Sequence, residues 1–184
     1  MQTGWSRLPD YPIETGYAAA FAVNNTVFVV GGRDATTAHS AVFMLNVNAP
    51  DASWQPGPEL PRALFGLVGG VIGETIYVTG GFEPDDAGAY RPASEVLALD
   101  LSQLDAAWRT VTRLPRTDLE WPMAATCDGQ LYVVGGSGGG VPLDSAWALD
   151  VTESTWRTCR AMPVALSSGA AAAFDGHDVL IAGG

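Results

Sequence analysis

Val27-Phe28-Val29-Val30-Gly31-Gly32 is an apolar run that ends in a glycine pair, and the sequence repeats this pattern three more times. The other copies are Ile76-Tyr77-Val78-Thr79-Gly80-Gly81, Leu131-Tyr132-Val133-Val134-Gly135-Gly136 and Val179-Leu180-Ile181-Ala182-Gly183-Gly184. Short apolar runs bounded by glycine are typical of buried β-strands. Their spacing, near 50 residues, indicates an internal structural repeat.

Tryptophan and proline residues recur at nearly fixed distances from the glycine pairs. Four tryptophans precede the first glycine of their pairs by 26, 26, 27 and 27 residues, and a proline follows each tryptophan after seven positions. These residues are Trp5, Trp54, Trp108 and Trp156, with Pro12, Pro61, Pro115 and Pro163. A third mark, Leu-Asn/Asp-Val/Leu, occupies residues 45–47, 99–101 and 149–151. The agreement of several residue types predicts three complete units and part of a fourth.

Each unit is expected to form four short strands. A dipeptide that favours tight hairpin turns separates the first strand from the glycine-pair strand. The four dipeptides are Asn24-Asn25, Gly73-Glu74, Asp128-Gly129 and Asp175-Gly176. The third strand carries the Leu-Asn/Asp mark, whose Asn or Asp is expected to close the following turn through its side chain. The fourth strand holds the tryptophan, whose ring is expected to pack against the neighbouring sheet.

Such units must stack, because one four-stranded sheet cannot bury both of its faces alone. The glycine pair, the later tryptophan and the period near 50 resemble the kelch repeat, and the resemblance covers essentially the whole chain. It implies an all-β fold of kelch-type β-propeller blades, each a four-stranded antiparallel sheet. One departure concerns the tyrosine that many kelch repeats place seven residues before the tryptophan. Leu149 stands there in the third unit, and the first two units carry extra residues, so the kelch subfamily is left open.

The repeats predict one domain over residues 1–184. Residues 1–12 would supply the fourth strand of a preceding or closing blade, residues 13–61, 62–115 and 116–163 three blades, and residues 164–184 a partial blade. This arrangement gives 15 strands and leaves the terminal blade without its third strand. Kelch propellers usually have six or seven blades, roughly 300–350 residues at this period. We therefore expect a fragment of a larger propeller or a propeller completed by another chain, with homo-oligomerisation through the open ends as a hypothesis.

Composition narrows the classes of partner. Lys and Arg number 9 against 20 Asp and Glu, a net charge of -11, which disfavours binding to nucleic acid. No apolar run approaches the 18 or so residues of a membrane span. The N-terminus lacks the basic and apolar regions of a secretory signal, which predicts a cytoplasmic protein. Two His and two Cys show no ligand spacing, so neither a metal nor a cofactor is predicted.

Candidate ligand-binding residues lie in the loops that the kelch resemblance places on the binding face. These loops join the second strand to the third and one blade to the next, and they mix acids, arginines and aromatics that suit a sugar or peptide ligand. The candidates are Arg33, Asp34, Glu83, Asp85, Asp86, Tyr90, Arg91, Arg116, Asp118, Glu120 and Trp121. No catalytic residue can be assigned. The glycine-rich segment 135–140 lacks the Lys-Ser/Thr of a phosphate loop and is expected to be a flexible loop.

Three functional hypotheses follow. The first is a non-catalytic module that binds a protein, a peptide or a carbohydrate. The second is a sugar-processing enzyme, because the pattern of repeats looks like that of sialic-acid mutarotases, which are six-bladed kelch proteins. That resemblance implies an acid/base pair and an arginine for the sugar carboxylate. The third is a truncated or engineered array of repeats without activity of its own.

Overall fold

The computed structural model describes residues 4, 5, 7–103 and 105–184 of the chain. These residues form strands, isolated bridges and turns, and none of them lies in a helix. The described part of the chain therefore contains no helix of the length and apolarity needed to cross a membrane.

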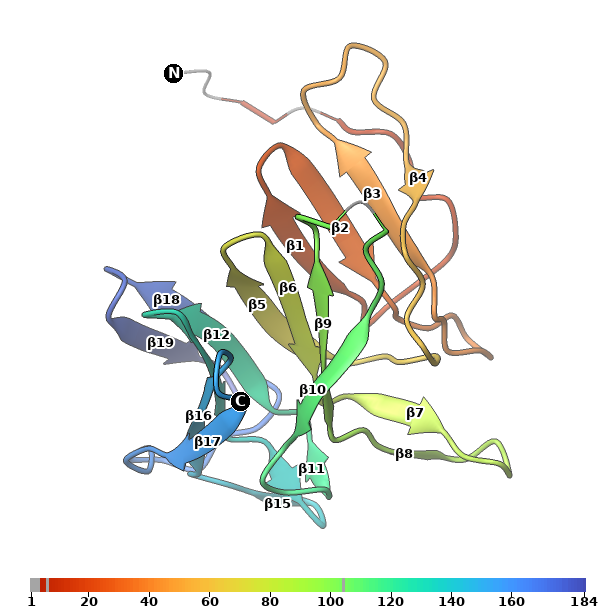
Figure 1. Cartoon of the computed structure of the whole chain (residues 1–184). Helices are drawn as coiled ribbons and strands as arrows, with labels where there is room; N and C mark the ends of the chain where they lie inside the picture. Colours follow the sequence, from red (N-terminus) through yellow and green to blue (C-terminus); the bar gives the residue numbers. More distant parts are fainter. Residues whose placement is uncertain (1–3, 6, 104) are drawn as a thin grey trace.

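Three four-stranded antiparallel sheets and one hairpin follow one another along the chain (Figure 1). Blade 1 contains β1 (Ala19–Val23), β2 (Thr26–Val30), β3 (Val42–Asn46) and β4 (Gln55–Pro56). Blade 2 contains β5 (Val68–Ile72), β6 (Thr75–Thr79), β9 (Glu95–Asp100) and β10 (Arg109–Arg113). Blade 3 contains β12 (Met123–Cys127), β13 (Gln130–Val134), β16 (Ala146–Asp150) and β17 (Thr155–Thr158). Blade 4 contains β18 (Ala170–Phe174) and β19 (Asp178–Ala182). The predicted four-stranded antiparallel blades are confirmed.

Additional short strands lie in the loops, so the count of strands is higher than the 15 expected. They form a hairpin of β7 (Phe82–Pro84) and β8 (Tyr90–Pro92), and a small sheet of β11 (Leu119–Glu120), β14 (Ser137–Gly138) and β15 (Val141–Pro142). The expectation of a flexible loop at residues 135–140 was therefore wrong. Gly139 and Gly140, with φ of 59° and 79°, make a tight turn that lets Ser137 pair with Pro142.

The strand predicted around Trp5 stays a prediction. Residues 4, 5 and 7–12 carry no assigned strand, and residues 1–3 and 6 lie outside the described residues. Trp5 itself is fully exposed.

The turn chemistry read from the sequence is confirmed. Asn24, Gly73, Asp128 and Asp175 all have positive φ, between 49° and 61°. The third strand of each complete blade ends in an Asn or Asp whose Oδ1 accepts a hydrogen bond from the backbone N–H two residues later. The three bonds are Asn48 N to Asn46 at 3.0 Å, Ser102 N to Asp100 at 3.0 Å and Thr152 N to Asp150 at 2.9 Å.

The core lies between blades rather than within one sheet. Leu45, Ile76, Leu97, Leu99, Leu131 and Leu149 are completely or almost completely buried. The half-buried ring of Trp108 packs against a cluster shared by blades 1 and 2, and that of Trp156 against a cluster shared by blades 2 and 3. The packing of these tryptophans against a neighbouring sheet is thus confirmed. Burial on both faces of β6 agrees with its continuous apolar run.

The blades present two different ends. The first strands β1, β5, β12 and β18 are neighbours, so the blades converge along these strands. One end carries the two-residue turns. The other end, which we call the loop face, carries the glycine-pair loops 31–41, 80–94 and 135–145 and the links 57–67, 114–122 and 159–169 between blades. The labelled loop strands β7, β8, β11 and β15 gather at the lower end of the view in Figure 1. All sequence-predicted candidate residues lie on the loop face.

Candidate functional site

Five aromatic side chains form one connected cluster on the loop face, which we call the aromatic cluster. Its members are Tyr17, Phe65, Phe82, Tyr90 and Trp121. Ring centroids lie 5.8 Å apart for Tyr17 and Trp121, 4.9 Å for Phe82 and Trp121, 5.4 Å for Phe65 and Phe82, and 4.8 Å for Phe65 and Tyr90. The rings come from the segment before blade 1, the link between blades 1 and 2, the β7–β8 hairpin and the link between blades 2 and 3. The cluster therefore exists only when several blades are stacked.

A repeated backbone conformation places two of these rings. Tyr17, Gly66, Trp121 and Ser168 each lie two residues before the first strand of a blade and have φ of 56°, 66°, 48° and 60°. Backbone hydrogen bonds link neighbouring positions, from Gly66 N to Tyr17 O at 2.7 Å and from Ser168 N to Trp121 O at 3.1 Å. Bulky side chains adopt positive φ only at a cost, and such residues concentrate at functional sites.

A cavity of about 480 Å³ opens among these positions. Its wall includes Tyr17, Gly66, Trp121, Pro122, Ser168 and Gly169. The missing side chain of Gly66 makes room for the Trp121 ring, because a Cβ at residue 66 would lie 3.0 Å from a ring carbon of Trp121. A cavity of this size with aromatic walls and a few polar groups suits a ring-shaped ligand.

Arg33 connects the loop of blade 1 to the aromatic cluster. Its guanidinium carbon lies 5.1 Å from the Phe65 ring centroid and 5.0 Å from that of Tyr90. Its Nε donates to the carbonyl oxygen of Asp34 at 3.0 Å, and its Nη2 donates to that of Ala35 at 3.2 Å. These contacts fix the guanidinium against the two rings. The structure thus brings three sequence-predicted residues, Arg33, Tyr90 and Trp121, into one connected group.

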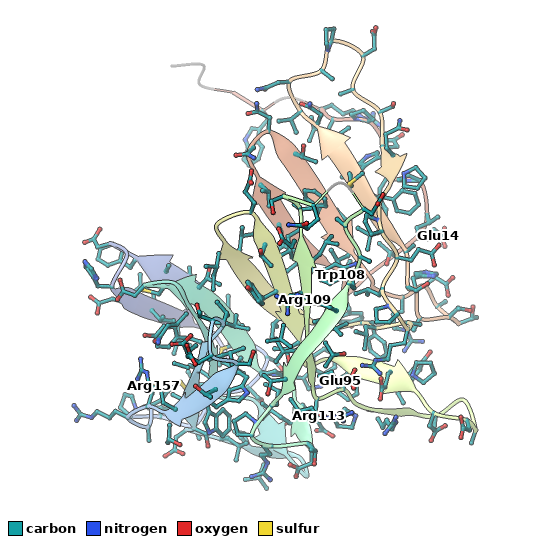
Figure 2. All side chains as sticks on the ribbon, in the orientation of Figure 1. Glu14, Glu95, Trp108, Arg109, Arg113 and Arg157 are labelled. Carbon is teal, nitrogen blue, oxygen red and sulfur yellow. The ribbon has the colours of Figure 1, made fainter. Side chains whose placement is uncertain are left out.

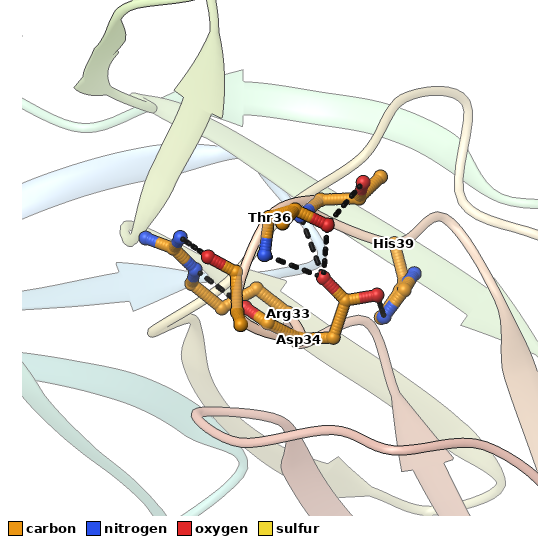
Figure 3. Close-up of polar contacts among 6 residues, drawn as sticks. Arg33, Asp34, Thr36 and His39 are labelled. Atoms are coloured by element: carbon orange, nitrogen blue, oxygen red, sulfur yellow. Dashed lines mark hydrogen bonds and ion pairs between the residues drawn. The ribbon is translucent and has the colours of Figure 1, made fainter.

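Asp34 is turned onto its own loop (Figure 3). Its Oδ1 accepts hydrogen bonds from the backbone N–H groups of Thr36 and Thr37, each at 2.7 Å, and from the Thr36 hydroxyl at 3.0 Å. These hydrogen bonds hold the pKa of Asp34 below its usual 3.8, and the two from backbone N–H groups have the largest effect. Its Oδ2 lies 3.7 Å from His39 Nε2. In this structure the Asp34 carboxylate organises the loop that carries Arg33.

The β7–β8 hairpin has one aromatic face and one charged face. Glu83 lies opposite Arg91, and Pro84 lies opposite Tyr90. Because side chains alternate along a strand, Phe82 and Tyr90 share the face toward the aromatic cluster, whereas Glu83 and Arg91 share the other. The hairpin separates an aromatic site from a charged one.

Five charged side chains meet on the second face, and we call them the arginine–glutamate network. Arg62 Nε lies 2.8 Å from Glu83 Oε2, Arg91 Nη2 lies 2.7 Å from Glu83 Oε1, and Arg113 Nη2 lies 2.7 Å from Glu95 Oε1. Arg62 also pairs with Glu95. The Glu83 side chain is only 10% exposed, so its charge is compensated by two guanidinium groups rather than by bulk water.

The candidate ligand-binding residues predicted from the sequence include Glu83 and Arg91 but not Arg62, Glu95 and Arg113. Glu95 and Arg113 lie directly opposite each other on β9 and β10, and Figure 2 shows both labels at the lower end of this blade. Their pairing depends on the register between two strands, which the repeat pattern does not specify. An arginine one residue after Pro61 was the available signal for Arg62.

The other predicted residues lie outside both groups. Asp85 Oδ1 accepts hydrogen bonds from Ala87 N and Ala89 N, at 2.9 and 2.8 Å, and closes the hairpin tip beside the exposed Asp86. Arg116 Nη2 donates to Asp118 Oδ2 at 2.9 Å, and this bond lowers the pKa of Asp118. A ligand-binding role for these four residues stays a prediction, as it does for every other candidate residue.

Glu120 directly precedes Trp121 and belongs to β11. It is half-buried, and its Oε2 accepts a long hydrogen bond of 3.4 Å from the buried Ser137 hydroxyl. Its carboxylate is thus less engaged than those of Asp34, Glu83, Asp85 and Asp118.

Metal-ligating side chains are not gathered in the described part of the chain, where no group of three or more His, Cys, Asp or Glu residues is arranged to hold a metal ion. Cys127 and Cys159 are both free thiols. Burial raises the pKa of the Cys127 thiol, whose Sγ donates to the carbonyl oxygen of Gly176 at 3.0 Å.

Known proteins are similar to this chain in sequence and in fold. A Kelch motif model matches residues 124–163, within blade 3 and the link that follows it. N-acetylneuraminate epimerases of Haemophilus influenzae strains PittEE and 86-028NP are each 30% identical to the chain over 153 residues, which is 80% of this chain and 37% of theirs. The match thus spans little more than a third of the length of these relatives.

A solved structure, that of YjhT, has the same fold. It matches with a TM-score of 0.76 at 16% sequence identity, covering 89% of this chain and 56% of that chain. The chain therefore contains a kelch motif, has the fold of kelch-type β-propeller blades and is similar in sequence to N-acetylneuraminate epimerases.

Proposed function

We propose that this chain contributes to a propeller that acts on N-acetylneuraminate or a closely related acidic sugar, as an enzyme of the mutarotase or epimerase type. One observation carries the proposal: residues from several blades form the aromatic cluster, in which Tyr17 and Trp121 line the 480 Å³ cavity on the loop face. Arg33 joins this cluster through the rings of Phe65 and Tyr90. The activity named for the Haemophilus influenzae relatives supports the choice of sugar.

The side chains of this site have the chemistry that an acidic sugar requires. Tyr17 and Trp121 border the cavity and offer ring faces against which the apolar face of a pyranose packs. Arg33, held over Phe65 and Tyr90, offers a guanidinium group to a carboxylate. The Ser168 hydroxyl supplies a polar group in the cavity wall.

Interconversion of sugar anomers needs little more than proton transfer. A base removes the proton of the anomeric hydroxyl and an acid protonates the ring oxygen, so the ring opens and recloses on the other face. We assign both steps to Glu120: its carboxylate takes the proton of the anomeric hydroxyl, and the acid so formed gives a proton to the ring oxygen. Glu120 directly precedes Trp121 of the cavity wall, and its carboxylate accepts only a long hydrogen bond from Ser137 among the contacts of the described residues. The Glu83 carboxylate is instead paired with Arg62 and Arg91 on the other face of the hairpin.

Binding is tested first, because the chain spans only part of its relatives. Saturation-transfer NMR with N-acetylneuraminate should show contact with the intact chain, and Trp121→Ala and Arg33→Gln should each reduce the signal. Asp51→Asn, in the exposed turn between β3 and β4 at the end opposite the loop face, is the control that should not. Absence of any N-acetylneuraminate signal from the folded chain would contradict the proposal.

Catalysis is tested by exchange spectroscopy of the N-acetylneuraminate anomers with and without the protein. The chain should accelerate exchange, and Glu120→Gln should remove the acceleration while sugar binding persists. Binding without acceleration would overturn the enzymatic part of the proposal.

Binding of N-acetylneuraminate without acceleration of exchange would favour a non-catalytic binding module. Tyr17 is 65% exposed and Tyr90 36% exposed, as expected for aromatics that contact a glycan or a peptide directly. Arrays of glycans and peptides would then identify the ligand class.

A further inference from the structure

The charged face of the β7–β8 hairpin borders a second cavity, of about 280 Å³. All five members of the arginine–glutamate network line it, together with Pro92, Ser94 and Thr117. None of these residues lines the aromatic cavity of about 480 Å³. The two cavities therefore have different walls and different chemistry.

The charges in this second cavity alternate in a fixed order. The ion pairs run from Arg91 to Glu83, from Glu83 to Arg62, from Arg62 to Glu95 and from Glu95 to Arg113. All four carboxylate oxygens of the two glutamates take part in these pairs. The series begins and ends in an arginine, so the cavity has three positive and two negative charges in a chain whose net charge is -11.

Arg91 and Arg113, the first and last members of this series, have N–H donors that form no ion pair within the network. The Arg91 side chain is 65% exposed and that of Arg113 is 64% exposed, and each guanidinium group has five N–H donors. In the network each forms one ion pair, through Nη2. Ser94 and Thr117 add hydroxyl groups to the same wall. A small anion placed between the terminal arginines would continue the alternation of charge.

We propose that this cavity binds a small oxyanion, a carboxylate or a phosphate, between Arg91 and Arg113. The planar guanidinium group matches the geometry of such anions, and two of them on one ligand give both charge and orientation. A cation is disfavoured, because Glu83 and Glu95 are already paired with arginines. This inference does not depend on the function proposed for the aromatic cavity.

Titration of the whole chain with inorganic phosphate at constant ionic strength, followed by calorimetry and by amide NMR shifts, tests the proposal. Saturable binding should move the amide signals of Ser94 and Thr117. Arg91→Gln and Arg113→Gln should each weaken phosphate binding about tenfold or more, because each removes a charge-assisted hydrogen bond. Arg109→Gln is the matched control, because Arg109 lies at the other end of β10 and outside the cavity wall.

Acetate in place of phosphate separates the two kinds of anion, and tighter binding of either one identifies the class of ligand. The exposed positions of Arg91 and Arg113 allow both variants to fold, which circular dichroism and thermal melting verify. Non-saturable binding, unmoved Ser94 and Thr117 signals, or an equal loss in Arg109→Gln would each overturn the anion site. Trp121→Ala should leave phosphate binding intact, so failure of the sugar proposal and failure of this one are distinguishable.

Discussion

The indole Nε1 of Trp108 donates a hydrogen bond of 2.8 Å to the carbonyl oxygen of Pro58, 50 residues earlier in the chain. Trp108 precedes the outer strand of blade 2, whereas Pro58 follows the outer strand of blade 1. The same bond recurs from Trp156 to the carbonyl oxygen of Arg113 at 2.7 Å. Each bond joins a blade to the one before it, so the repeated tryptophan fixes the spacing of blades as well as filling space between them.

Trp108→Phe keeps most of the apolar ring and removes this hydrogen bond. We expect the free energy of unfolding to fall by about 1 kcal/mol, because one net hydrogen bond is lost and the carbonyl of Pro58 is left without this donor. Chemical denaturation followed by circular dichroism measures the change. Trp5→Phe is the control, since Trp5 is fully exposed and its substitution should leave stability within about 0.5 kcal/mol of the parent. Equal losses in both variants would show that the bond contributes nothing.

Gly66→Ala tests the contact between the backbone and the Trp121 ring. The added methyl group would lie 3.0 Å from a ring carbon of Trp121, and φ at residue 66 is 66°. Gly73→Ala carries the same conformational cost at φ of 61° but meets no atom within 4 Å. We expect Gly66→Ala to be the more destabilising variant by roughly 1 to 2 kcal/mol, the cost of overpacking. Denaturation curves give the difference, and Trp121 fluorescence should change only in Gly66→Ala. Identical stability of the two variants would contradict the close contact.

The architecture could be predicted because the same pattern of residues recurs in each repeat. Glycine pairs, turn dipeptides and the Asn46 and Asp100 turn closures are local signals, and each depends on residues that are near one another in sequence. The hairpin β7–β8 was missed because its strands are only three residues long and belong to no repeat. Short strands of this kind are set by loop packing rather than by a hydrophobic period.

Some residues of the candidate site could be predicted from the sequence, but their arrangement in space could not. Tyr90 and Trp121 were identified from their loops, whereas Tyr17 and Phe65 acquire their place through contacts between blades. Asp34 shows a second limit of prediction from sequence. An acidic residue in a loop is a candidate for ligand binding whether its side chain faces a ligand or, as in Asp34, accepts hydrogen bonds from its own turn. The choice between these depends on backbone N–H directions, which the sequence does not give.

Glu83→Gln tests the anchoring of the β7–β8 hairpin. The substitution leaves Arg62 and Arg91 without the charge that both contact, at a position where the Glu83 side chain is 10% exposed. We expect a loss of about 2 kcal/mol in unfolding free energy, the usual scale of hydrogen bonds to charged groups. Hydrogen exchange should also quicken at the amide of Ala93, which bonds to the carbonyl oxygen of Gly81 at the base of the hairpin.

A matched control for Glu83→Gln lies on the same hairpin. Asp86→Asn makes the same change, from a carboxylate to an amide, at the exposed tip and should leave both stability and exchange unchanged. If Glu83→Gln behaves like Asp86→Asn, the hairpin is held by its aromatic face alone.

The Asp34 loop should loosen in acid. Because the pKa of Asp34 is lower in the folded chain than its usual 3.8, its carboxylate stabilises the loop fully above that value. The contribution is lost as the pH falls through the lowered pKa, since protonation removes the negative charge that strengthens the hydrogen bonds from the Thr36 and Thr37 amides. A carboxyl NMR titration should give Asp34 an apparent pKa below 3.8, with the amide signals of Thr36 and Thr37 shifting in the same step.

Two substitutions separate the contributions to this pKa. Thr36→Val removes the hydroxyl at 3.0 Å but keeps the two amide donors at 2.7 Å, so the pKa of Asp34 should rise only part of the way to its usual value. Asp34→Asn keeps an acceptor oxygen without the charge, and its loop should no longer respond to acid in this range. Since Asp34 closes the loop that carries Arg33, the Arg33 side-chain NMR signal should follow the same titration in the parent chain and stay constant in Asp34→Asn. A parent chain in which Arg33 ignores the titration of Asp34 would show that the aromatic rings alone hold the guanidinium group.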